Sequence, residues 1–262
     1  SIIMPNFNSI TTVLSSLISI KNQTFEFYEC IIVDDNSSDE SLYLIEEFVK
    51  QDKRFKIIKS RINRGVSFSR NTGISQAKGR YLAFLDSDDI WDEKFLENNL
   101  SIRLNQDIPI SHSPYIRFKA LNSNLAKGVV VNTPQIIDNS NILKKNFLPL
   151  LSVFLDRNIV GDINFKDIRP EDYDLWIDLI KERNLYSIST NKISCFYRIS
   201  YLQRSKNKMK AFVRICKFYK LKLKINNIIA FFYGLRWMSF NILSRFKKFK
   251  DNKYLNTSDK IL

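Results

Sequence analysis

The sequence predicts an α/β protein with a mainly parallel, doubly wound sheet that is flanked by helices. Over residues 1–92, short apolar runs of strand length alternate with segments in which apolar side chains recur at helical spacing. The connections between these segments are short, and the apolar runs are continuous, as is typical of strands buried on both faces. Polar residues follow several of the runs, at the edge of the sheet where ligands bind in such folds.

Four apolar runs are expected to form strands over residues 2–5, 28–33, 55–59 and 81–85. Helical spacing predicts helices between them, over residues 9–20, directly after residue 39, and over residues 67–77. Beyond residue 105 the pattern is weaker, with one strand expected over residues 110–118 and an apolar element over residues 150–155. An amphipathic helix is expected to begin at Glu171.

The fourth run stops on the acidic stretch Asp86-Ser87-Asp88-Asp89. Carboxylates this close repel one another, and holding them partly buried costs free energy unless a positive charge compensates. Mg²⁺ and Mn²⁺ take oxygen ligands, usually from one or two carboxylates together with substrate phosphates and water. The stretch therefore predicts a divalent-cation site, and the alternative is an Asp-rich turn that caps the next helix.

Several classes of protein are disfavoured by composition. The 262 residues include three widely spaced cysteines, which argues against a disulfide framework or a zinc site, and one histidine, His112, which is expected to be structural. No GxGxxG follows the first strand and no GxxxxGK[ST] occurs, so an NAD enzyme and a P-loop NTPase are disfavoured. No signal peptide is visible at Ser1, and a reducing, cytoplasmic setting is expected.

The net charge of +14 is concentrated at the C-terminal end. Residues 201–262 hold 16 of the 41 Lys and Arg residues but only two acidic residues, whereas the two signs balance over residues 1–200. Two basic amphipathic helices are expected there, over residues 205–225 and 228–246. Their composition favours docking on an anionic membrane surface. The alternatives are packing on the rest of the chain, formation of a homodimer, and nucleic-acid binding, which is the least favoured.

Seven stretches, in this order, resemble the GT-A-fold glycosyltransferases of family 2, the large inverting group that builds bacterial surface polysaccharides. They are SIIMPNFN (1–8), IIVDDNSSD (31–39), NRG (63–65) with SRNTGI (69–74), AKGRY (77–81) with DSDD (86–89), and PEDYDLW (170–176). The resemblance extends to about residue 200. It implies a GT-A fold, with a nucleotide-sugar-binding half over residues 1–108, an acceptor-binding half over 109–200, and a basic helical tail over 201–262.

The resemblance also implies a UDP-sugar donor and the residues that would contact it. Phe7 would stack on the uracil ring, unless it is a core residue, and Asp35 would accept the uracil N3–H. Arg64 or Arg70 would meet the base or the diphosphate, since an Arg offers forked donors for such acceptors, although Arg70 could equally be a surface helix residue. Asp86 would contact the ribose. The remaining donor-side candidates are Pro5 and Ser87.

The family pattern further implies a metal ligand and a catalytic base. Asp88 would hold Mn²⁺ or Mg²⁺, and the ion would bridge the two phosphates and neutralise charge as UDP departs. Asp172 would take the proton from the acceptor hydroxyl, because inversion needs a base opposite the leaving group. A helix N-terminus favours the ionised carboxylate, although an ordinary acidic first turn would look the same in sequence. Glu171 would contact the acceptor or support the fold.

The expected function is therefore that of an inverting glycosyltransferase. It would move a hexose or an N-acetylhexosamine from a UDP-sugar to a lipid-linked oligosaccharide acceptor in bacterial cell-surface polysaccharide synthesis, peripheral to the inner face of the cytoplasmic membrane. One alternative is a non-catalytic GT-A-like scaffold protein at the membrane. Another is a phosphate-accepting α/β switch domain, against which the pair Glu171-Asp172 counts.

Overall fold

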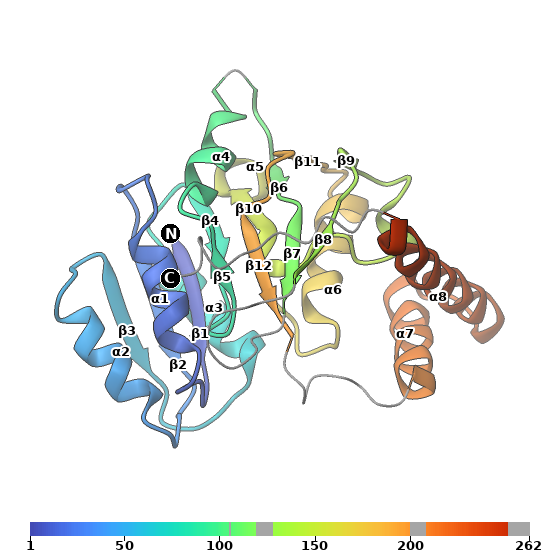
Figure 1. Cartoon of the computed structure of the whole chain (residues 1–262). Helices are drawn as coiled ribbons and strands as arrows, with labels where there is room; N and C mark the ends of the chain where they lie inside the picture. Colours follow the sequence, from blue (N-terminus) through green and yellow to red (C-terminus); the bar gives the residue numbers. More distant parts are fainter. Residues whose placement is uncertain (105, 119–127, 200–207, 251–262) are drawn as a thin grey trace.

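The computed structural model describes residues 1–104, 106–118, 128–199 and 208–250. Its centre is a sheet of eight strands (Figure 1). The strands are β1 (Ile2–Asn6), β2 (Cys30–Asp34), β3 (Phe55–Lys59), β4 (Tyr81–Phe84), β6 (Ile110–His112), β9 (Ile136–Ile137), β10 (Val153–Asp156) and β11 (Ser187–Ser189). They are arranged in the order β3-β2-β1-β4-β10-β6-β11-β9. The four strands expected at the start of the chain are therefore neighbours.

The sheet is mostly parallel, as predicted. Strands β3, β2, β1 and β4 run parallel to one another, and β6 runs parallel to β11. Strand β10 lies antiparallel between β4 and β6, and β9 is antiparallel to β11. Because β10 lies between β4 and β6, strands from both halves of the chain form one sheet. Because β1, β2 and β4 run parallel, their carboxyl ends meet at one edge of the sheet.

Helices cover both faces of this sheet, and alternate residues of β1 point to opposite faces. Ile2 and Met4 pack with the core residues of α1 (Val13–Lys21), α2 (Ser41–Val49) and α4 (Phe95–Ser101). Ile3 faces the other side, which is covered by α3 (Val66–Gln76) and α6 (Glu171–Ile177). A Cβ built on Gly73 of α3 would lie 2.6 Å from the Ile3 side chain, so only glycine allows this close approach of α3 to β1.

The strand expected over residues 110–118 is two strands in different sheets, which corrects the sequence prediction. β6 belongs to the large sheet, whereas β7 (Tyr115–Phe118) belongs to a second sheet with β5 (Ile90–Trp91), β8 (Gly128–Val131) and β12 (Cys195–Arg198), in the order β5-β12-β7-β8. Pro114 lies between β6 and β7 and cannot donate to a ladder, so it separates them. The apolar element at 150–155 is a 3₁₀ turn, η2 (Leu150–Ser152), followed by β10.

The predicted C-terminal helices are present as α7 (Lys208–Leu223) and α8 (Asn227–Lys250), which lie side by side at one end of the molecule (Figure 1). Ile215, Phe218 and Tyr219 of α7 are buried in the main core, so this part of the tail packs on the rest of the chain. Residues 201–207 and 251–262 of the predicted tail lie outside the described residues. Within the described ranges, no helix combines the length and the apolar character that crossing a bilayer requires.

Candidate active site

Three carboxylates gather at the carboxyl end of β4. Asp86, Asp88 and Asp89 can each offer one oxygen, and these oxygens all lie within 4.8 Å of one another. Such a spacing suits a hard divalent cation that takes oxygen ligands, so the residues present fit the predicted Mn²⁺ or Mg²⁺. Asp86 and Asp88 are partly exposed, whereas Asp89 is buried. The first two are therefore the members of the group that a ligand from solvent can reach.

Asp89 ties the acidic loop to the second sheet. Its Oδ1 accepts from the backbone N–H of Arg198 at 2.8 Å, and the Arg198 Nε donates to the backbone oxygen of Asp88 at 2.7 Å. Burial raises the pKa of Asp89 well above its usual range, and the neighbouring carboxylates of Asp88 and Asp86 raise it further. The guanidinium of Arg198 also lies 4.9 Å from the ring centre of Phe118. Asp89 and Arg198 thus fix the backbone that presents Asp88.

Arg70 lies between the acidic loop and the start of α6. Its Nη2 donates to both oxygens of Asp86, at 2.8 and 3.0 Å, and its Nη1 donates to Glu171 Oε1 at 2.9 Å. Burial lowers the pKa of Arg70, but the two carboxylates more than offset this and the net shift is upward. Arg70 is only 3% exposed, so the alternative of a surface helix residue is wrong. A contact between Arg70 and the donor stays a prediction.

The two aspartates at the carboxyl end of β2, Asp34 and Asp35, hold the loops that surround the predicted donor site. Asp34 accepts from Asn6 Nδ2 at 2.7 Å and also from the backbone of Ser37, so it joins the ends of β1 and β2. Asp35 accepts from the backbone N–H groups of Arg64 and Gly65 at 2.9 and 2.7 Å. Asp35 is therefore a loop anchor in this structure, and its predicted contact with uracil is an additional role that these hydrogen bonds leave untested.

Phe7 extends beyond the end of β1, with 48% of its surface exposed. The alternative that Phe7 is a core residue is therefore wrong, and its ring is accessible to a planar ligand. Arg64 is also at this edge, where its guanidinium lies 4.6 Å from the ring centre of Phe68. The other donor-side candidates, Pro5 and Ser87, are buried.

Asp172 lies in the first turn of α6, next to Glu171. Its Oδ2 accepts from Asn146 Nδ2 at 2.8 Å, and its Oδ1 accepts from the backbone N–H of Tyr173 at 2.7 Å. Burial raises the pKa of Asp172 to about 6, with a further contribution from the Glu171 carboxylate; Arg70 and the two hydrogen bonds act in the opposite direction. A carboxylate of this pKa is ionised at neutral pH and basic enough to accept a proton.

Helix α6 is held firmly in the core. Trp176 is fully buried and its Nε1 donates to the backbone oxygen of Leu148 at 2.8 Å, so Trp176 is a core residue. The Tyr173 hydroxyl donates to the backbone oxygen of Ile142 at 2.7 Å.

The lone histidine, His112, is buried at the end of β6, and burial lowers its pKa to about 4. Its ring nitrogens contact Ser187 Oγ and the Pro134 oxygen.

Sequence reasoning missed two residues of this site, Asn146 and Arg198. Asn146 lies in the poorly patterned region between residues 105 and 170, where no periodicity marks it. Arg198 is the last residue of β12, and its contacts with Asp88 and Asp89 span more than a hundred residues of sequence. No local signal distinguishes either residue from an ordinary polar one.

Comparison with known proteins identifies the family. The family model described as "Glycosyl transferase family 2" matches residues 1–102. The Escherichia coli protein WfgD, named as a UDP-Glc:alpha-D-GlcNAc-diphosphoundecaprenol beta-1,3-glucosyltransferase, is 36% identical over 214 residues, which cover 82% of each chain. The chain belongs to glycosyltransferase family 2. The resemblance seen in the sequence motifs is thereby confirmed.

Two solved structures show that this glycosyltransferase has the GT-A fold. Staphylococcus aureus TarS (residues 1–349), in complex with UDP-GlcNAc, superposes with a TM-score of 0.68 at 18% identity, covering 98% of this chain and 76% of that one. The mannosyltransferase PcManGT from Pyrobaculum calidifontis, in complex with GDP-Man and Mn²⁺, gives a TM-score of 0.63 at 14% identity, covering 91% and 73%. At these identities the likeness concerns the fold alone.

Proposed function

We propose that this family 2 enzyme is an inverting transferase that moves a hexose or an N-acetylhexosamine from a UDP-sugar to a lipid-linked oligosaccharide. The product would enter a bacterial cell-surface polysaccharide such as O-antigen, capsule or lipooligosaccharide. The observation that carries the proposal is the link through Arg70 between the acidic loop and the helix that begins with Glu171 and Asp172. The name of WfgD and the UDP-GlcNAc bound to TarS support the donor class, and the name of WfgD supports the acceptor class.

The donor would lie across the carboxyl ends of β1, β2 and β4. The exposed ring of Phe7 suits stacking on the uracil base. Asp35 would accept the uracil N3–H, and Arg64 would meet the base or the diphosphate with its forked donors. Asp86, held in one orientation by Arg70, would contact the ribose. Pro5 and Ser87 would shape the floor beneath the nucleotide.

Asp88 would be the protein ligand of a Mn²⁺ or Mg²⁺ ion. When bound, such an ion acts as a Lewis acid that neutralises the charge developing on the departing diphosphate. The chain contributes the orientation of Asp88, because Arg198 contacts the backbone oxygen of Asp88 and Asp89 anchors the following residue.

Asp172 would act as the general base. As the acceptor hydroxyl oxygen forms its bond to the anomeric carbon, the bond from that carbon to the UDP oxygen breaks and the hydroxyl proton passes to Asp172. Attack from the face opposite the leaving group inverts the anomeric configuration. Asn146 holds one oxygen of Asp172, and the Tyr173 N–H holds the other, so the carboxylate is oriented before the acceptor arrives. Glu171 would contact the acceptor or steady the helix start through Arg70.

The enzyme would work as a peripheral protein at the inner face of the bacterial cytoplasmic membrane. A lipid-linked acceptor confines the reaction to that surface. The basic residues concentrated over residues 201–262 support attraction to anionic lipids.

A panel of UDP-sugars tests the proposal, each added to the protein with Mn²⁺ and with EDTA while the melting temperature is followed. Binding to the native state raises the midpoint, so the donor should give a metal-dependent shift. The transferred product is then examined by NMR. A β-linked product from an α-linked donor supports inversion, whereas an α-linked product contradicts it.

A further inference from the structure

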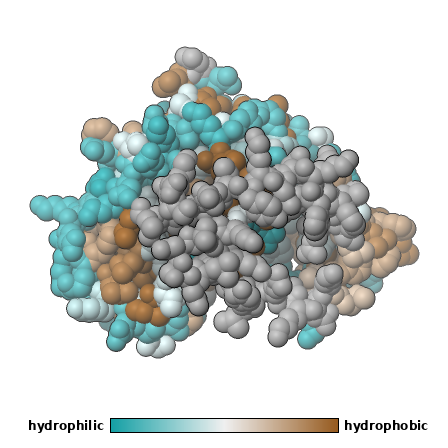
Figure 2. All heavy atoms as spheres, in the orientation of Figure 1, coloured by the Kyte–Doolittle hydropathy of each residue, from teal (hydrophilic) through white to brown (hydrophobic). Residues whose placement is uncertain are grey.

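The start of α8 carries a cluster of exposed apolar side chains. Ile228, Ile229, Phe231 and Phe232 are 70%, 43%, 48% and 63% exposed, and we call these four residues the α8 patch. Figure 2 shows apolar surface at the end of the molecule formed by α7 and α8. The ring of Phe231 lies against that of Phe212 in α7, with 5.6 Å between ring centres, and all four side chains remain exposed to solvent. Burying large apolar groups in water-free surroundings is favourable, so an exposed cluster of this kind indicates a contact surface.

The charged side chains of α7 and α8 are all of one sign. No acidic residue occurs between Lys208 and Lys250; α7 carries basic residues along its length, and α8 carries them from Arg236 onward. The basic side chains described as exposed are Lys210, Arg214, Lys217, Lys220, Lys224 and Arg236. Two copies of such a surface would repel each other, which disfavours a homodimer through this face. An anionic phospholipid bilayer offers both a negative surface and an apolar interior, and it fits this combination.

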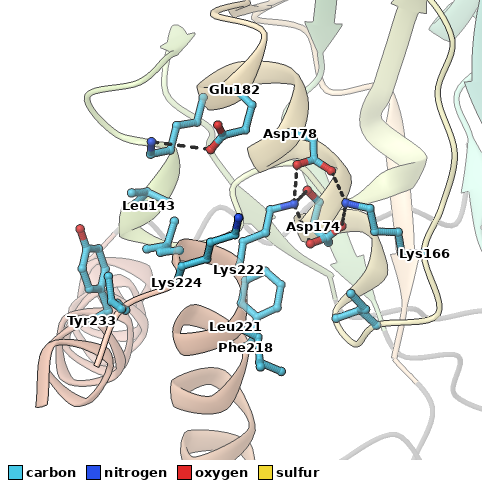
Figure 3. A pocket seen from close by; sticks show the side chains of 14 residues that line it. Leu143, Lys166, Asp174, Asp178, Glu182, Phe218, Leu221, Lys222, Lys224 and Tyr233 are labelled. Atoms are coloured by element: carbon cyan, nitrogen blue, oxygen red, sulfur yellow. Dashed lines mark hydrogen bonds and ion pairs between the residues drawn. The ribbon is translucent and has the colours of Figure 1, made fainter. Parts of the chain in front are cut away.

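Helix α7 is joined to α6 by a buried ion pair. Lys222 of α7 donates to Asp174 Oδ1 and to Asp178 Oδ1, both at 2.7 Å, and Lys166 donates to the other oxygen of Asp178 at 2.8 Å (Figure 3). Asp174 lies in α6, two residues beyond Asp172, and Asp178 begins the π-helical turn (Asp178–Glu182) that continues it. Lys222 and Asp174 are nearly buried, so water competes weakly for this bridge.

A second contact joins the same helices on their buried side. The hydroxyl of Tyr219 in α7 lies 3.0 Å from the hydroxyl of Tyr173 in α6, and it donates to the backbone oxygen of Leu143 at 3.1 Å. The ring of Phe218 stacks on that of Tyr173, with 5.5 Å between ring centres. A body attached to α7 and α8 would therefore set the orientation of α6, and with it the orientation of Asp172.

We propose that the α8 patch and the basic side chains of α7 and α8 dock the enzyme on an anionic bilayer, and that this docking orients Asp172 toward an acceptor embedded in the same bilayer. The inference deepens the proposed function and rests on it. The aromatic and aliphatic side chains of the patch enter the headgroup region, while the lysines and arginines contact lipid phosphates.

Vesicle co-sedimentation of the full chain tests the docking. The vesicles are phosphatidylcholine alone, or phosphatidylcholine with about 30% phosphatidylglycerol, and each basic contact strengthens binding to the anionic vesicles. We expect at least about tenfold tighter binding to the anionic vesicles, and at least about tenfold weaker binding for the double variant Phe231→Ser, Phe232→Ser. Phe27→Ser is the matched control, since Phe27 is 88% exposed but lies between α1 and β2. Equal binding of wild type and double variant overturns the proposal.

A transfer assay separates docking from catalysis. One acceptor is a water-soluble, short-chain analogue, and the other is the same saccharide diphosphate on a long lipid in anionic vesicles. The double variant should match wild type on the soluble acceptor and lose most transfer to the embedded one. If wild type transfers to neither acceptor, the proposed function fails, while vesicle binding still reports on docking. The proposal is overturned if wild type does not bind vesicles but instead forms a dimer or binds nucleic acid, and the double variant loses that interaction.

Discussion

The guanidinium Nη2 of Arg70 donates to both carboxylate oxygens of Asp86, at 2.8 and 3.0 Å. The other end of the same guanidinium contacts Glu171, so one buried cation joins the acidic loop after β4 to the first turn of α6. The proposed donor side and the proposed acceptor side of the site are therefore held together by a residue that solvent barely reaches. This link has consequences for stability as well as for catalysis.

Replacing Arg70 by Gln should destabilise the fold markedly. Removing Arg70 leaves the carboxylates of Asp86 and Glu171 without a compensating positive charge. We expect the free energy of unfolding to fall by about 3 kcal/mol, at the lower end of the range for a broken buried ion pair, because Asp86 is partly exposed. Urea denaturation measures the loss. Arg54→Gln is the control, because Arg54 pairs with Asp52 nearer the surface and should cost below about 1 kcal/mol. Equal losses of unfolding free energy in the two variants would show that the ion pairs of Arg70 stabilise the fold no more than a surface pair does.

The rate of transfer should depend on the ionisation of Asp172. Since burial and Glu171 raise the pKa of Asp172 to about 6, the base is protonated and inactive below that pH and ionised above it. The value of kcat should therefore rise with pH, reach half its plateau at about pH 6, and level off at higher pH. Initial rates between about pH 4.5 and 8 trace this profile. A rate that is independent of pH across this range would be inconsistent with Asp172 as the base.

Glu171→Gln provides a sharper form of the same test. The variant removes a negative charge beside Asp172 and frees Arg70 from one of its two carboxylates, and both changes favour the ionised base. The acidic limb of the rate profile should move to lower pH, even if the maximal rate falls. Glu182→Gln, which alters an exposed glutamate beyond α6, serves as the control. A limb that moves to higher pH would argue against the assigned charges.

Asp88→Ala should abolish the metal dependence of donor binding. Asp88 is the proposed ligand of Mn²⁺ or Mg²⁺, and without it the ion loses its protein anchor. Calorimetric titration with UDP measures the change. Wild type should bind UDP more tightly in Mn²⁺ than in EDTA, whereas the variant should bind UDP with the same weak affinity in both. Asp92→Ala keeps the acidic cluster intact and should behave as wild type. Retained Mn²⁺ dependence in Asp88→Ala would remove Asp88 from the proposed site.

Phe7→Ala should weaken UDP binding by about tenfold, since stacking of a base on an aromatic side chain is worth about 1–3 kcal/mol. The exposed ring contributes little to the core, so the melting temperature without ligand should change little. Phe27→Ala, at another exposed phenylalanine, is the control. If the UDP affinities of the Phe7 variant and wild type agree within about twofold, the base lies elsewhere.

The first half of the fold could be predicted because its signals are local. Apolar runs, intervening helical spacing and a run that ends on Asp86 together specify strands, helices and the edge where a site forms. The role of Arg70 was not predictable in this way, because its partners lie 16 and 101 residues away. Family resemblance supplied Asp172 as a candidate base, but its contact with Asn146 depends on how the weakly patterned region folds.

The C-terminal helices illustrate the same limit. Helical spacing correctly predicted a helix at α7, but it did not decide which face is buried. In the structure the apolar side chains of Met209 and Val213 are 68% and 58% exposed, whereas Ile215 and Phe218 face the core. Which face of a helix is buried depends on its partner, and the partner here is α6, which the tail sequence does not reveal.

Acceptor-dependent release of UDP is the decisive assay for transfer and for Asp172 as its base. The protein is mixed with the UDP-sugar that stabilises it, Mn²⁺ and a saccharide-diphosphate-lipid acceptor, and UDP is measured for wild type and for Asp172→Asn. We expect release by wild type only when acceptor is present, and a rate lower by about 10²–10⁴-fold in the variant despite unchanged donor binding. Donor binding without acceptor-dependent release in wild type would refute the transferase activity, and undiminished release by Asp172→Asn would refute the role of Asp172.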